Sequence, residues 1–136
     1  MQSDEASLFH DASLCGVLPK VALGFALSRQ WWHSMEGIDL VLTPALSENP
    51  APLDSLTYAA CGSDLDRWVE RGYRFAPFAV PANLAGQPSA VLPISLTDTG
   101  LPVAVQITDR PDGDALVLRV SNALEDAIGW AGLGLI

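Results

Sequence analysis

The chain has 136 residues, which is enough for one domain with a modest core but not for two. Hydrophobic residues make up 49% and charged residues only 17%, so other protein is expected to cover part of the apolar surface. Sixteen acidic against seven basic residues give a formal charge of −9, which disfavours nucleic acid and anionic membranes as partners.

Targeting and metal-binding signals are absent from the sequence. The first residues are acidic where a signal peptide is basic, and the apolar runs are interrupted well before the length of a membrane span. We therefore expect a cytoplasmic location and no membrane partner. Cys15 and Cys61 lack CxxC spacing, and His10 and His33 stand alone, so no disulfide framework, metal site or cofactor is predicted.

Two helices and a strand are predicted in the N-terminal third. A short helix is expected over residues 4–15, and Pro19 can open a second helix that Gly37 stops. The apolar stripe expected on that second helix consists of Val21, Phe25, Trp32 and Met35. Residues 38–43 then read as a largely buried strand, closed by Pro44 because proline cannot continue a ladder.

A long loop and two helical segments are predicted in the middle of the chain. Residues 45–56 are rich in Pro, Ala and Ser without periodicity, which is typical of an extended surface loop. Ser63, with an acid three residues later, is predicted to cap a short helix that ends at Gly72. The apolar segment 75–84 is expected to be helical in part, although two prolines restrict where a regular turn can form.

The last third predicts an antiparallel hairpin followed by a helix. Residues 90–96 and 101–108 are strand-like runs joined by the turn residues 97–100. Acidic residues around Gly113 are expected to cap the final helix. Its apolar stripe consists of Val117, Val120, Leu124 and Ile128. The order of these elements indicates a mixed α/β layer structure.

Three motifs stand in an order that is typical of one enzyme family. They are DLVLTP at 39–44, ANLAGQPSAVLP at 82–93 and GLPVAVQ at 100–106. Together with the helix that follows, they resemble the C-terminal end of the amidase signature family. The match runs from about residue 39 to 130, whereas residues 1–16 carry no recognisable match. The resemblance implies a single partial domain over 1–136, with a partial mixed sheet and flanking helices.

The resemblance also identifies what these residues lack. The family uses a catalytic lysine and two serines, set in Gly/Ser-rich sequence of the N-terminal half, and nothing in these residues matches that motif. Lys20 is the only lysine, and it stands at the head of an apolar helix. A serine hydroxyl without a base in reach is a weak nucleophile. We therefore predict no catalytic residue here and no amide hydrolysis by this chain alone.

Substrate-pocket candidates follow from the resemblance as well. Family members often line the acyl or substrate pocket with the segment that corresponds to residues 75–83. The resemblance thus implies Phe75, Phe78, Val80 and Asn83 as pocket residues. The alternative is that they only shape the fold, since Asn83 could equally hydrogen-bond loop backbone.

Two functions remain open at this point. In the first, the chain is a piece of an amide hydrolase that contributes sheet and pocket wall, with a small amide substrate bound only once the site is completed by an N-terminal amidase half. Self-association is the other way to cover its apolar face. In the second, it is a non-catalytic remnant that acts as a binding or assembly module. A neighbouring reading frame with the Ser and Lys motifs would favour the first.

Overall fold

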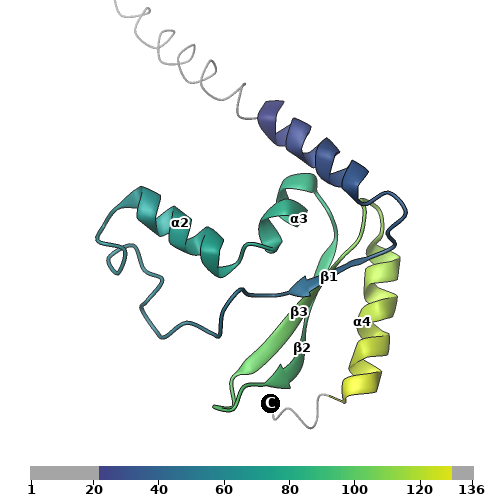
Figure 1. The fold of residues 1–136 in the computed structure, drawn as a ribbon. Coiled ribbons are helices and arrows are strands. Elements are labelled where there is room, and N and C mark those ends of the chain that lie inside the picture. The colour runs from purple at the N-terminus through teal and green to yellow at the C-terminus, as the bar shows by residue number, and fades with distance from the viewer. Residues whose placement is uncertain (1–21, 130–136) are drawn as a thin grey trace, which may run out of the picture.

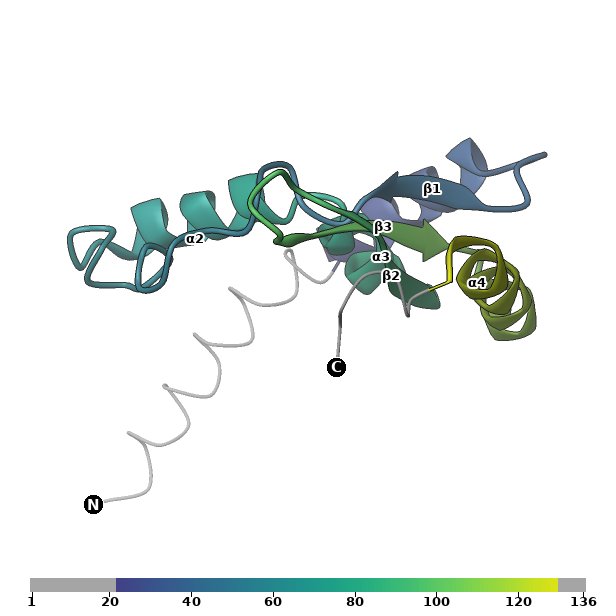
Figure 2. The ribbon, with the colours of Figure 1, turned by 90° about the horizontal axis from the view of Figure 1, so that it is seen from below.

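The computed structural model of the chain describes residues 22–129. A helix over residues 22–34 is followed by β1 (Val41–Pro44), α2 (Leu65–Phe75), α3 (Ala79–Ala85), β2 (Ser89–Leu96), β3 (Pro102–Thr108) and α4 (Asp114–Ile128). Figures 1 and 2 show α4 beside the sheet, while α2 extends beyond it on the other side. The mixed α/β fold is confirmed, and the helix predicted over 4–15 lies outside the described residues.

The predicted hairpin forms the larger part of a three-stranded sheet. The strand order is β1-β3-β2, and both neighbouring pairs are antiparallel. Leu92 lies opposite Val105 in the hairpin. Its turn is closed by the Thr97 amide, which donates to the Leu101 carbonyl at 2.7 Å, and Gly100 takes a φ of +80° there. Gly is the residue that adopts this conformation without strain, so the turn chemistry accounts for the pairing.

Strand β1 is shorter than predicted and includes the proline that was expected to close it. The Ala45 amide donates to the Ala104 carbonyl of β3 at 2.9 Å. Hydrogen-bonded and non-bonded positions alternate along an antiparallel pair, so the nitrogen of Pro44 faces away from β3. A proline fits an edge strand in this position because no ladder donor is required there.

Helix α4 packs against β2 and β3, and the predicted stripe is on its inner side. Val117 is buried, while Val120, Leu124 and Ile128 are half-buried. The predicted acidic cap is wrong, because the cap position is Gly113, which has no side chain. The nearby Asp109 is buried instead, and its carboxylate accepts from the Arg110 amide at 2.6 Å.

The helix over residues 22–34 packs on α3 through part of the predicted stripe, because the Trp32 indole donates to the Ala85 carbonyl at 3.2 Å. Ser28 is buried and donates to the Leu84 carbonyl at 2.8 Å. Met35, in the turn after this helix, is buried as expected, but Phe25 is 64% exposed and Trp32 is 38% exposed. Apolar residues occur around much of this helix, so their spacing does not reveal which side α3 covers. Gly37 ends the element as predicted, in a turn with a φ of +78°.

Helix α2 begins and ends at other residues than predicted. Its cap is Asp64, whose carboxylate accepts from the Arg67 amide at 3.1 Å, whereas Ser63 has a φ of +55°. An aspartate at the cap satisfies one of the free amides of the first turn. Gly72 lies inside the helix, which continues to Phe75. The preceding residues 45–64 contain no helix or strand, in agreement with the predicted loop.

The short helix α3 has a proline, Pro81, near its start and a glycine, Gly86, just after its end. Pro81 lies in the first turn, where an amide donor is not needed. Gly86 follows the last turn with a φ of +64°, and the next amide, of Gln87, returns to the Ala82 carbonyl at 3.0 Å. None of the helices within residues 22–129 combines the length and apolar character that a membrane crossing needs.

Candidate functional site

A surface cavity of about 500 Å³, widely open to solvent, lies between the loop, α2 and α3. Its walls are Leu56, Trp68, Val69, Gly72, Tyr73, Ala76, Ala79, Val80 and Asn83. The structure therefore brings together two of the pocket residues that the resemblance implies, Val80 and Asn83. The other two, Phe75 and Phe78, are not among the lining residues. The role of all four residues in a substrate pocket stays a prediction.

Helix α2 supplies the apolar wall of this cavity. Trp68, Val69 and Tyr73 lie on one side of the helix, and all three are partly exposed. The Trp68 indole is held by the loop, because its nitrogen donates to the Leu56 carbonyl at 2.9 Å. The Tyr58 ring meets the same indole edge-on, with centroids 6.3 Å apart. The loop thus holds a large apolar side chain in place at the cavity, which stiffens the wall.

The start of α3 is held by a buried glutamine on the sheet. Gln106 is 4% exposed, and its side-chain amide donates to the Phe78 carbonyl at 3.2 Å and to the Thr108 hydroxyl at 3.1 Å. Thr108 in turn shares a hydrogen bond of 2.9 Å with Ser89. This polar chain fixes the residue at the N-terminal end of α3. Val80, two residues further on, is positioned in the cavity as a result.

The two phenylalanines have other surroundings. The Phe75 ring lies under the Arg71 guanidinium, 5.5 Å from its centroid to the guanidinium carbon. Phe78 is the cap residue of α3 and contributes its carbonyl to Gln106. The motif at 100–106 ends with Gln106, and an amide inside an otherwise apolar strand is a signal for a buried hydrogen-bonding role. Its partner, the Phe78 carbonyl, was not predicted.

The cavity lining that the described residues supply is apolar with a few hydrogen-bonding groups. Its titratable side chain is the Tyr73 phenol, and no carboxylate, histidine, lysine or cysteine lines the cavity. In the described part of the chain, no cluster of side chains could hold a metal ion. Asn83 and Tyr73 can donate and accept hydrogen bonds beside an apolar surface. Such a cavity can hold a small molecule with an apolar segment and one or two polar groups.

Comparisons with known proteins agree on one family. The model of the family described as Amidase matches residues 20–118. The 6-aminohexanoate-cyclic-dimer hydrolase of Pseudomonas sp. is 32% identical over 74% of this chain and 21% of its own length. The enzyme of the same name from Paenarthrobacter ureafaciens is 31% identical over 74% of this chain and 21% of its own length.

A solved structure of 6-aminohexanoate cyclic dimer hydrolase in complex with its substrate is similar in fold as well. It matches with a TM-score of 0.65 at 31% identity, over 76% of this chain and 22% of that one. The chain therefore spans about a fifth of the length of the relatives that it matches.

Proposed function

Since the chain belongs to the amidase signature family, we propose that it is the C-terminal piece of an amide-bond hydrolase and contributes sheet and one wall of the substrate pocket. The catalytic serines and lysine are then supplied by an N-terminal half. The observation that carries this proposal is the cavity between α2 and α3, which combines an apolar wall, two hydrogen-bonding side chains and no nucleophile.

A small amide with an apolar segment is the substrate class that this wall fits. Val80 and Trp68 offer apolar contact, while Asn83 can pair with either end of an amide group. The cyclic dimer of 6-aminohexanoate combines amide groups with methylene segments, and it is named as the substrate of relatives that are 32% and 31% identical. It is therefore a reasonable first probe.

The test is complementation. The chain is co-expressed with the N-terminal part of a 6-aminohexanoate-cyclic-dimer hydrolase that has lost the matching segment, and hydrolysis of the cyclic dimer is followed. We expect activity only when both pieces are present. Val80→Trp fills the cavity and should lower the rate at least tenfold, whereas Leu118→Trp, at a position 62% exposed on α4, should leave it unchanged. Equal hydrolysis rates for the two variants would refute the proposal that the surface around Val80 forms a wall of the substrate pocket.

The apolar side of the helix over residues 22–34 supports the same proposal. Leu23 and Leu27, four residues apart on one side of this helix, are both exposed, and neighbouring exposed apolar side chains are a usual site of protein association. We expect this surface to be covered by the N-terminal half or by a second copy. Light scattering over a concentration series, with and without the N-terminal half, should show association in both cases. A monomer that ignores this partner at high concentration would contradict the proposal.

A second candidate is a non-catalytic binding or assembly module. It is favoured by the cavity lining, which can bind but has no group that attacks an amide. In that case the chain associates without conferring hydrolysis on any N-terminal half. Binding of the cyclic dimer with no turnover in the complementation experiment would select this second function.

A further inference from the structure

The side of α2 that faces away from the cavity carries a cluster of arginines. Arg67, Arg71 and Arg74 follow one another at spacings of four and three residues, which places them on one face of the helix. The whole chain has only seven basic residues against sixteen acidic ones. Three of them lie on two turns of one helix, which also carries the acidic residues Asp66 and Glu70 and the cap residue Asp64.

This surface is hollowed rather than flat. A hollow of about 450 Å³ lies between α2 and residues 60–62, and the three arginines line it together with a single carboxylate, that of Glu70. A second hollow of about 550 Å³ faces the loop and shares Arg71 and Arg74 with the first. Arginine side chains thus line two concave spaces of the size that a small anion or metabolite needs, together with the carboxylate of Glu70 in the first and of Glu48 in the second.

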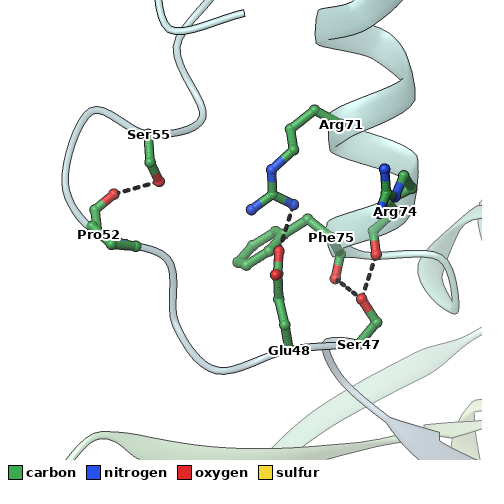
Figure 3. Close-up of polar contacts among 7 residues, drawn as sticks. All are labelled: Ser47, Glu48, Pro52, Ser55, Arg71, Arg74 and Phe75. Atoms are coloured by element: carbon green, nitrogen blue, oxygen red, sulfur yellow. Dashed lines mark hydrogen bonds and ion pairs between the residues drawn. The ribbon is translucent and has the colours of Figure 1, made fainter.

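Arg71 already contacts a carboxylate of the chain itself. Its guanidinium lies over the Phe75 ring and forms an ion pair with the carboxylate of Glu48, as Figure 3 shows. The loop that carries Glu48 is tied to the helix by Ser47, whose hydroxyl hydrogen-bonds the carbonyls of Arg74 and Phe75. The aromatic ring and the loop therefore hold one guanidinium in place, which lowers the cost of ordering it around a ligand.

Arg67 and Arg74 are held less firmly by neighbouring carboxylates than Arg71 is. Arg67 lies 3.9 Å from the carboxylate of Asp64, and both side chains are well exposed, so this pair contributes little. Within residues 22–129, Arg74 forms no ion pair. Two guanidinium groups beside the hollows are thus free to bind an incoming anion in the forked geometry that matches carboxylate and phosphate oxygens.

We propose that these hollows bind a small molecule with a carboxylate or phosphate group, held by Arg67 and Arg74 and by Arg71 as a pre-oriented third contact. Glu48 then competes with the ligand for Arg71. The site is separate from the cavity on the apolar side of α2 and does not depend on the proposed hydrolase role.

Calorimetric titration of the 136-residue chain tests this proposal. Inorganic phosphate and succinate are titrated separately, with sodium chloride keeping the ionic strength constant. Saturable binding of either anion is expected, and the anion that binds assigns the chemistry. Arg74→Ala should weaken it about tenfold, as the loss of a charge-assisted hydrogen bond implies. The matched control is Arg119→Ala, at an exposed position on α4, which should change nothing.

Glu48→Gln gives a result of opposite sign, which a folding defect would not produce. Removal of this carboxylate frees Arg71, so binding should tighten several-fold. Absence of saturable binding for both anions would overturn the proposal. An equal loss in Arg74→Ala and Arg119→Ala would do so too, because it would reduce the effect to net charge. An unchanged affinity in Glu48→Gln would show that Arg71 does not contact the bound anion, contrary to the proposal.

Discussion

Gln106→Leu is expected to loosen the start of α3 and with it the cavity. In the native chain the Gln106 amide donates to the Phe78 carbonyl and to the Thr108 hydroxyl, and Thr108 keeps a second partner in Ser89. The variant therefore leaves the Phe78 carbonyl as the one unpaired group. An unpaired buried acceptor costs about 1–3 kcal/mol. Because Phe78 is half-buried, we expect the lower part of that range, about 1–2 kcal/mol of unfolding free energy.

Urea unfolding followed by tryptophan fluorescence measures this loss. The matched control is Gln30→Leu, which removes the same side chain from an exposed position and should change the unfolding free energy by less than about 0.5 kcal/mol. Gln106→Leu should also reduce the affinity of the cavity for a small apolar amide, since Val80 follows Phe78 closely. An unchanged urea midpoint for Gln106→Leu, or an equal drop for both variants, would refute the positioning role.

Three further predictions concern other parts of the fold. In Gly113→Ala the new Cβ would lie 2.1 Å from Oδ2 and 2.7 Å from Cβ of Asp109, so rotation of the carboxylate cannot relieve the clash. We expect a loss of about 1–3 kcal/mol that Asp109→Gly partly cancels in a double-mutant cycle, and strictly additive losses would contradict this. Asp64→Ala should destabilise α2 by about 1 kcal/mol, whereas Ser63→Gly should be neutral or stabilising because its φ is +55°; circular dichroism during thermal unfolding compares them. The chain alone should release no product from simple amides above background, and turnover that persists through repeated purification would disprove that.

The candidate site was only partly predictable from the sequence. The resemblance implied four pocket residues, and the fold places Val80 and Asn83 on one cavity while Phe75 and Phe78 make other contacts. Within one short segment, helix geometry decides which side chains share a face. The other wall of the cavity comes from α2 and from Leu56 in the loop, whose contact with Trp68 joins residues on two different elements. Nothing in the local pattern of either element specifies that contact.

The sequence by itself determined the features that depend only on residues close together in the chain. The hairpin follows from two apolar runs joined by a turn with Gly100, and the inner side of α4 follows from its periodicity. Tertiary structure alone decided that Phe25 on the helix over residues 22–34 stays exposed and where Gln106 finds its acceptor. Both outcomes rest on contacts between residues far apart in the chain. A local pattern states that a side chain is apolar or polar, whereas its partner is set by the packing of separate elements.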